Sequence, residues 1–199
     1  MSGLVERLRR LHAAGHAAEA ELRDERASRP DGPFRPAAVL AAVTDCERPG
    51  FLFIHRPSNM RSHPGQVAFP GGKIDDGETP VEAALREAWE ELDIDTDAVT
   101  VIGQSDTYLT ASGFAITPVL AVVPANIAIT PNPTEVAQWF EAPVDFVLDR
   151  ANHERQYGVW NGVKRGYTQI MWQEHRIWGV TAGIVANLSR RIAWGSGDD

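Results

Sequence analysis

The chain has 199 residues and a formal net charge of −8, with 43% hydrophobic and 23% charged residues. These values are ordinary for one globular domain with a sizeable core, and the acidic balance argues against a nucleic-acid backbone as main partner. The single cysteine, Cys46, excludes a disulfide framework and fits a reducing cytoplasm. No apolar run has membrane-spanning length, and the N-terminus lacks the apolar core of a signal peptide.

The N-terminal part of the chain is predicted to be a helix joined to the main domain by a connector. Over residues 3–27, leucines recur at helical spacing among charged residues, which is typical of an amphipathic helix. We expect this helix to pack on the domain or on a partner, and a homodimer is left open as one arrangement. Residues 28–36 are proline-rich and predict the connector. The chain thus divides into residues 1–33 and a domain over residues 34–199.

Short apolar runs along the domain predict its β-strands. These runs lie at residues 37–43, 51–54, 99–103, 114–123 and 136–140. Pro118 interrupts the fourth run and predicts a position at a sheet edge or a bulge. The dipeptide Asn161-Gly162 is a strong turn signal and predicts a hairpin between residues 154–160 and 163–172.

Helices and strands alternate in this domain without a regular repeat. Besides the helix described next, helices are expected over residues 143–148 and 180–192. Because short hairpins are mixed with helices, the pattern predicts a mixed sheet flanked by helices rather than a purely parallel sheet. The expected class is α/β (α+β).

The segment that most constrains function is a helix over residues 79–92, which follows the glycine-rich stretch 69–72. Glu87, Glu90 and Glu91 lie three and four residues apart, so they share one face near the negatively polarised end of this helix. Several carboxylate oxygens on one face suit Mg²⁺ or Mn²⁺ better than Zn²⁺, so the pattern indicates a divalent-cation site. A solvated acidic face is the alternative interpretation.

The residues of this segment fall at the spacing of a known signature. The matching positions are Gly72, Glu78, Arg86, Glu87, Ala88, Glu90, Glu91 and Ile94. On these residues the chain resembles the Nudix hydrolases, with one departure, because Asp93 stands where the signature has a glycine. The resemblance implies a Nudix fold, in which a mixed β-sheet is sandwiched between α-helices. It also implies an enzyme that hydrolyses a nucleoside diphosphate linked to another moiety.

The resemblance implies a role for each acid of the helix. Glu87, Glu90 and Glu91 would hold Mg²⁺ or Mn²⁺, together with the backbone carbonyl of Gly71. The metal would orient the diphosphate and activate a water molecule for attack on phosphorus. A glutamate would accept the proton of that water, and Glu87 and Glu135 are both open as the base.

Arg86 is expected to hold the catalytic machinery in place. By resemblance it pairs with Glu78 and ties the loop before the helix to the helix itself. The local alternative is Glu82, which lies four residues before Arg86 and would form a favourable pair on the helix surface. The sequence alone does not decide whether Arg86 pairs with Glu78, with Glu82 or with both.

A second motif precedes the glycine turn and bears on the substrate. Its residues are Arg56, Arg61, Gly65 and the run Phe69-Pro70-Gly71-Gly72. Arginine binds phosphate through two parallel hydrogen bonds, so two arginines ahead of a metal site suit a multiply phosphorylated substrate. The motif resembles that of the coenzyme A diphosphatases among Nudix hydrolases, although Ile54 and Pro57 depart from it. By this resemblance both arginines, Gly65 and Phe69 would bind substrate. His63, also in this loop, is interpreted as hydrogen-bonded locally.

The second resemblance implies that coenzyme A or an acyl-CoA is cleaved at its diphosphate. The products would be adenosine 3′,5′-bisphosphate and phosphopantetheine or its acyl form, and the expected partner is therefore a small nucleotide, with no nucleic acid and no membrane. One rival is a Nudix diphosphatase acting on ADP-ribose, NADH or a dinucleotide, over which the arginine motif favours coenzyme A. Another is a non-catalytic Nudix ligand sensor, which would not need all of the acids and Arg86 to be intact.

Overall fold

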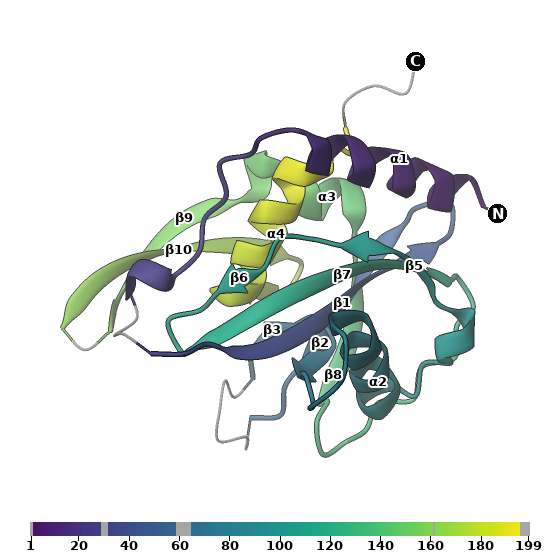
Figure 1. The fold of residues 1–199 in the computed structure, drawn as a ribbon, viewed down its shortest axis with the longest axis horizontal. Helices are drawn as coiled ribbons and strands as arrows, with labels where there is room; N and C mark the ends of the chain where they lie inside the picture. Colours follow the sequence, from purple (N-terminus) through teal and green to yellow (C-terminus); the bar gives the residue numbers. More distant parts are fainter. Residues whose placement is uncertain (1, 29–31, 59–64, 161, 196–199) are drawn as a thin grey trace.

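A computed structural model describes residues 2–28, 32–58, 65–160 and 162–195, which form two β-sheets with helices around them (Figure 1). The helices are α1 (Gly3–Ala17), α2 (Pro80–Leu92), α3 (Val144–Leu148) and α4 (Val180–Arg191), with short 3₁₀ turns at Arg26–Ser28, Thr96–Ala98 and Arg150–Asn152. The strands are β1 (Arg35–Asp45), β2 (Gly50–His55), β3 (Val67–Ala68), β4 (Gly71–Lys73), β5 (Thr100–Gln104), β6 (Tyr108–Leu109), β7 (Phe114–Pro124), β8 (Gln138–Pro143), β9 (Glu154–Trp160), β10 (Val163–Trp172) and β11 (His175–Trp178). No helix among these residues combines the length and apolar character needed to cross a bilayer.

The larger sheet is mixed, as predicted. Its main path runs β3-β2-β1-β7-β5, with β4 on β1, β6 on β7 and β8 on β2. Strands β1 and β7 are parallel over their whole length, from the pair Arg35 and Phe114 to the pair Asp45 and Pro124. The smaller sheet has the order β11-β10-β9 and is antiparallel.

Both faces of the larger sheet are buried, which explains the continuous apolar run of β1. Ala38, Leu40 and Ala42 point toward α2, whereas Ala41 and Val43 point into the core with α1, α3 and α4. Successive side chains of a strand face opposite ways, so a strand covered on both faces has no polar alternation. The sheet sandwiched between helices is the expected fold class, and it is confirmed.

The predicted N-terminal helix is wrong in length. Helix α1 ends at Ala17, and residues 18–25 continue as extended chain. The buried side of α1 is supplied by Val5 and Leu8, with Leu11 partly buried. The Arg191 guanidinium donates hydrogen bonds to the Gly15 carbonyl, at 2.8 Å, and to the Ala18 carbonyl. These bonds satisfy carbonyls at the end of α1, where the helix stops. The helix packs on the domain, as one of the two expected arrangements.

The edge position expected for Pro118 is also wrong, because β7 lies inside the sheet between β1 and β5. The proline is tolerated because it falls between the β7 residues paired with β5 and those paired with β6. Its carbonyl accepts a hydrogen bond from the Ser105 N–H at 2.8 Å. The short strands β3, β4, β6 and β11 were not predicted.

Other predicted elements hold with small changes. Val136 lies before β8 rather than in it, while α3 and α4 occupy nearly the expected ranges. The hairpin β9–β10 is confirmed, with Gly162 at a φ of 77°, a left-handed conformation that suits glycine. Asn161 lies outside the described residues.

Helix α2 is fixed at both ends. Thr79 caps its N-terminus in a capping box with Glu82, and Pro80 occupies the first turn. Its C-cap is Asp93, with φ 55° and ψ 32°, and the Asp93 N–H donates to the Trp89 carbonyl. Asp93 therefore adopts the left-handed conformation that the signature's glycine would adopt.

We expect replacement of Asp93 by glycine to stabilise the protein, by about 1 kcal/mol of unfolding free energy, because it removes both the left-handed strain and a negative charge at the helix C-terminus. Asp93→Asn is the matched control, since it removes the charge and keeps the side chain. Urea unfolding measures both. A gain for Asp93→Gly no larger than that for Asp93→Asn would show that the turn carries no strain.

Candidate active site

Three glutamates from two segments form a carboxylate cluster: Glu87, Glu91 and Glu135. One carboxylate oxygen of each lies within 4.8 Å of the others. Glu87 and Glu91 come from successive turns of α2, and Glu135 comes from the segment before β8. Glu91 is 1% exposed, whereas the other two are half-buried. The cluster is thus built around a carboxylate with almost no access to water.

The C-terminal end of α2 brings Glu135 to this cluster. The last carbonyls of a helix lack partners inside it. Here the Thr130 N–H donates to the Leu92 carbonyl at 2.8 Å, and the Asn132 N–H donates to the Glu91 carbonyl at 2.9 Å. The Asn132 side-chain amide then donates to the Glu135 carboxylate at 3.4 Å. The loop that caps α2 therefore also delivers the third acid.

The Gly71–Gly72 turn is fitted against the same two turns of α2. The Gly71 N–H donates to a carboxylate oxygen of Glu91 at 2.9 Å. A β-carbon on Gly72 would collide with the Glu87 carboxylate, and one on Gly71 would collide with the backbone of β1 at Ala38 and Val39. Position 71 therefore requires glycine for its close approach to β1, whereas a side chain at Gly72 would displace the Glu87 carboxylate.

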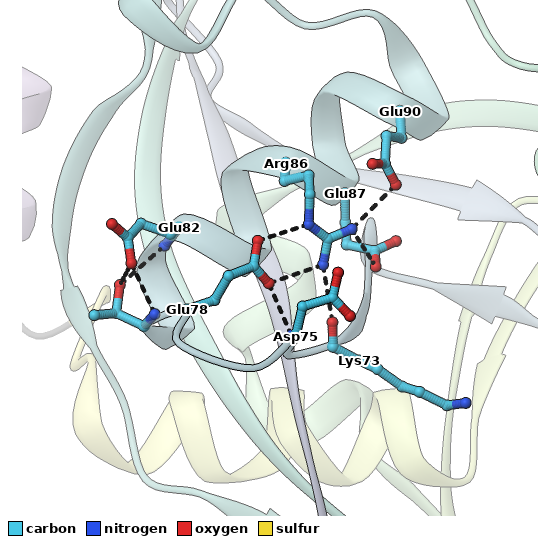
Figure 2. Close-up of polar contacts among 8 residues, drawn as sticks. Lys73, Asp75, Glu78, Glu82, Arg86, Glu87 and Glu90 are labelled. Atoms are coloured by element: carbon cyan, nitrogen blue, oxygen red, sulfur yellow. Dashed lines mark hydrogen bonds and ion pairs between the residues drawn. The ribbon is translucent and has the colours of Figure 1, made fainter.

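Arg86 joins four acceptors around this turn (Figure 2). Its Nε and Nη2 donate to the two carboxylate oxygens of Glu78 at 2.7 and 3.1 Å. Nη1 donates to Glu87 at 3.0 Å and to Glu90 at 3.1 Å, while Nη2 also reaches the Lys73 carbonyl at 3.0 Å. Arg86 thus ties the loop before α2 to the helix. It also holds Glu90, which lies outside the carboxylate cluster.

Of the two partners considered for Arg86, the structure has Glu78. The Glu82 carboxylate instead accepts from the N–H and hydroxyl of Thr79, both at 2.8 Å, as part of the helix cap. The hydrogen bonds from Arg86, and then the Asp75 N–H, lower the pKa of the Glu78 carboxyl. The same bonds raise the pKa of Arg86, which stays positively charged.

Burial raises the pKa of two carboxyls of the cluster, Glu87 and Glu91, whereas the pKa of Glu78 is lowered. Removal from water raises the pKa of Glu91 to about 8, against the opposing hydrogen bond from Gly71, and the neighbouring Glu87 and Glu135 raise it further. Burial likewise raises the pKa of Glu87, although the bond from Arg86 counteracts it. Without a cation, burial and the neighbouring charges therefore keep a proton on Glu91 up to a higher pH than usual.

The donor set of the cluster fits a hard divalent cation. All three groups offer carboxylate oxygens, which suit Mg²⁺ or Mn²⁺. Within the described part of the chain, no arginine or lysine bonds to Glu91 or Glu135, so their charge is not neutralised by the protein. A bound cation would supply the neutralisation that burial requires.

A cleft of about 470 Å³ opens beside the glycine turn, and we call it the catalytic cleft. Its lining includes Gly71, Gly72 and three basic residues, Arg35, Arg56 and Lys73. The Nε of Arg56 is buried and has no hydrogen-bond partner among the described residues. The charge of Arg56 also lowers the pKa of Glu91, although less than burial raises it. This cleft therefore places a guanidinium with an unsatisfied Nε within electrostatic reach of Glu91.

The other predicted substrate residues are placed differently. Gly65 closes the loop after β2, where its N–H donates to the Arg56 carbonyl at 3.1 Å and its φ is 67°. Phe69 lines the catalytic cleft but is 2% exposed, because its ring stacks on Phe53 with centroids 4.6 Å apart. Arg61 and His63 lie outside the described residues.

Two basic residues of the catalytic cleft were not found from the sequence. The Arg35 guanidinium lies over the Phe114 ring, 4.0 Å from its centroid, and donates to the Ser112 carbonyl at 3.3 Å. Lys73 follows the glycine turn in β4. Only the position of Lys73, directly after Gly72, could have signalled it. Arg35 reaches the cleft through the pairing of β1 with β7.

Comparisons with known proteins agree with this geometry. The family profile described as the NUDIX domain matches residues 34–159. The uncharacterized Nudix hydrolase NudL of Enterobacter sp. (strain 638) is 39% identical over 163 residues, covering 79% of this chain and 83% of that protein. NudL of Escherichia coli O7:K1 is 38% identical over the same shares of both chains. The chain therefore belongs to the Nudix hydrolase family.

A solved structure agrees with the fold. The crystal structure of RenU, a Nudix hydrolase from M. smegmatis, superposes with a TM-score of 0.52 and 27% identity. The superposition covers 60% of this chain and 76% of that one. The fold described above is therefore the Nudix fold.

The raised pKa of Glu91 predicts a pH dependence of stability for the metal-free protein. A carboxyl whose pKa rises from 4.5 to about 8 on folding binds more protons folded than unfolded between these values, so its contribution to stability is lost as pH rises through that window. The Glu91→Gln variant serves as the reference, because the glutamine side chain does not ionise in this pH range. We expect the unfolding free energy of the wild type, relative to this variant, to fall by at most about 1.4 kcal/mol per pH unit.

Urea unfolding in EDTA at pH 5.5, 7 and 8.5 measures this difference. Addition of Mg²⁺ at pH 8.5 should stabilise the wild type more than Glu91→Gln. Parallel pH profiles of the two proteins would contradict the buried placement of the carboxyl.

Proposed function

We propose that this Nudix hydrolase cleaves the diphosphate of coenzyme A or an acyl-CoA, giving adenosine 3′,5′-bisphosphate and phosphopantetheine or its acyl form. The observation that carries the proposal is the Arg56 guanidinium, whose buried Nε lacks a partner among the described residues and which lines the cleft beside the Gly71–Gly72 turn. A buried unsatisfied donor is costly, and a substrate phosphate would satisfy it. The lone cysteine, Cys46, is free and exposed, which suits the reducing cytoplasm where coenzyme A is used.

The shape and charge of the catalytic cleft suit the parts of such a substrate. Coenzyme A carries a diphosphate and a separate phosphate on its ribose, and Arg35 and Lys73 add two positive charges to that of Arg56. The apolar side chains of Val39, Ile116, Val180 and Ile184 line the remaining wall. This wall suits the pantetheine arm or an acyl chain, while the volume lies in the range of small-molecule sites.

The residues around the cluster divide the work of hydrolysis. Glu87, Glu91 and Glu135 would hold Mg²⁺ or Mn²⁺, which when bound neutralises phosphate charge and lowers the pKa of a water molecule. The Gly71 N–H keeps Glu91 oriented. Either Glu87 or Glu135 accepts the proton of the attacking water, since both are less buried than Glu91. Glu90, a metal ligand by resemblance, would have to leave Arg86 to join them.

Arg86 and Glu78 act through position. Their paired hydrogen bonds fix the turn, so the Glu87 carboxylate and the Gly71–Gly72 backbone keep their spacing while substrate binds. We therefore assign them to the support of the site rather than to contact with the reacting phosphorus.

A substrate panel tests the proposal. Purified protein with Mg²⁺ or Mn²⁺ is incubated with coenzyme A, ADP-ribose, NADH or a dinucleoside polyphosphate, and the products are separated. We expect coenzyme A to be split at the diphosphate. Cleavage of another substrate with coenzyme A intact would overturn the substrate and keep the hydrolase, and no cleavage with any substrate would favour a ligand sensor.

Two variants separate binding from chemistry in the same assay. Glu91→Gln should keep the fold and lower kcat by about a hundredfold or more, because it removes the most buried acid of the cluster. Arg56→Gln should chiefly raise KM for coenzyme A, by about tenfold, because it removes a charged phosphate contact. Arg10→Gln, on the exposed side of α1, is the control. Full activity of Glu91→Gln would exclude the carboxylate cluster as the metal site.

A further inference from the structure

A second cleft, of about 560 Å³, is lined by residues of β10, α4 and the extended segment that follows α1 and by none of the three glutamates of the carboxylate cluster. Figure 1 shows the course of these three elements. It shares no lining residue with the catalytic cleft. Helix α4 separates the two: Val180, Thr181 and Ile184 face the catalytic cleft, while Gly183 and Arg190 face the second one. The proposed hydrolysis makes no use of this cleft.

Several basic side chains line the second cleft: Arg23, Arg150, His153, Arg155 and Arg190, with two acids, Asp24 and Glu25. Arg23 pairs with Glu21 at 3.8 Å. Within the described part of the chain, no carboxylate forms a hydrogen bond or ion pair with the guanidinium groups of Arg150, Arg155 or Arg190. Arg150 and Arg190 both lie near His153: burial is the main cause that lowers the pKa of His153, and these two charges lower it further, against the Val147 carbonyl and Asp149, which raise it. The chain has a net charge of −8, so a cleft with three arginines that have no acidic partner differs from the average charge of the protein.

The acidic residues at this cleft are already engaged elsewhere. Asp24 accepts from the backbone N–H and the Nε of Arg26, at 2.9 and 2.8 Å. Glu25 accepts from the Ala111 N–H at 2.9 Å. Arg26 pairs with Asp24 at 2.7 Å. The cleft lining has Arg23, Arg150, Arg155 and Arg190 against the two acids Asp24 and Glu25, so its charge is net positive.

Two glycines shape the walls of this cleft. A β-carbon on Gly166 would collide with the Arg155 guanidinium, so the lack of a side chain on β10 lets this group lie flat across the strand. A β-carbon on Gly183 would collide with the ring and hydroxyl of Tyr108, which is 6% exposed. The Arg155 guanidinium therefore lies against the backbone of β10 at Gly166, on the exposed side of the cleft.

From these observations we propose that the second cleft binds a small phosphorylated metabolite with at least two negative charges, held by Arg150, Arg155 and Arg190. Guanidinium groups bind phosphate through paired, charge-assisted hydrogen bonds. The volume lies in the range of sites for small molecules, which favours a metabolite over a macromolecule. The site is independent of the proposed coenzyme A hydrolysis, because it shares no residue with the catalytic cleft.

Binding of inorganic pyrophosphate tests the proposal directly. Calorimetric titrations use the full chain in metal-free buffer with EDTA, so that the carboxylate cluster binds no pyrophosphate through a cation. We expect saturable binding by the wild type and a Kd raised at least about tenfold in Arg155→Gln/Arg190→Gln. Each single substitution should raise Kd by less, which keeps the test available if the double variant does not fold.

Two controls identify the site that is measured. Arg10→Gln/Arg48→Gln removes the same charge from exposed positions outside both clefts, and Arg56→Gln removes an arginine of the catalytic cleft. The exposed double variant should bind pyrophosphate within about twofold of the wild type, whereas Arg56→Gln should weaken only binding in the catalytic cleft and keep the binding that Arg155→Gln/Arg190→Gln removes. The proposal is overturned if the wild type shows no saturable binding, if the arginine variants of the second cleft bind unchanged, or if Arg56→Gln loses all binding. A loss in Arg56→Gln would leave the coenzyme A proposal standing.

Discussion

The close approach of α2 to the Gly71–Gly72 turn is the constraint on which the catalytic site depends. It puts the Glu91 carboxylate on a backbone N–H and leaves no room for a side chain between Gly72 and Glu87. A buried carboxylate needs hydrogen bonds or an opposite charge to offset the loss of water. Here the Gly71 N–H supplies one of those hydrogen bonds, and a bound cation would supply the opposite charge. One packing contact therefore sets both the position of the Glu91 carboxylate and its need for a cation.

Arg86 stabilises this contact, because its guanidinium donates hydrogen bonds to Glu78, Glu87 and Glu90 and to the Lys73 carbonyl. Its planar fork matches the two oxygens of Glu78, which a lysine could not do. The same group holds Glu90 and so removes one of the three acids that share a face of α2 from the cluster. Charge spacing on a helix thus identifies which acids are near one another. It does not identify which of them the fold will neutralise internally.

The catalytic helix could be predicted because its signals are local. Helix start, apolar face and acid spacing all lie within residues 79–93, and even the left-handed Asp93 was marked by its departure from glycine. From the sequence, Glu135 could be named only as one of two candidates for the base, because its position depends on how a distant loop caps α2. Arg35 could not be predicted from the sequence, since it enters the cleft through the register of β1 on β7. Helix α1 was overextended because its stop comes from Arg191, far along the chain.

The same limit applies to charge. A net charge of −8 describes the average surface, and on that ground the sequence disfavours a long polyanion as partner. It does not describe a concave region, where low-dielectric walls focus the field of a few groups. Acids gather at the carboxylate cluster and on exposed turns, while arginines line both clefts on either side of α4. An acidic protein can therefore present two separate cationic clefts to small phosphorylated molecules, and only the fold, which joins segments from β1 to α4, determines where they lie.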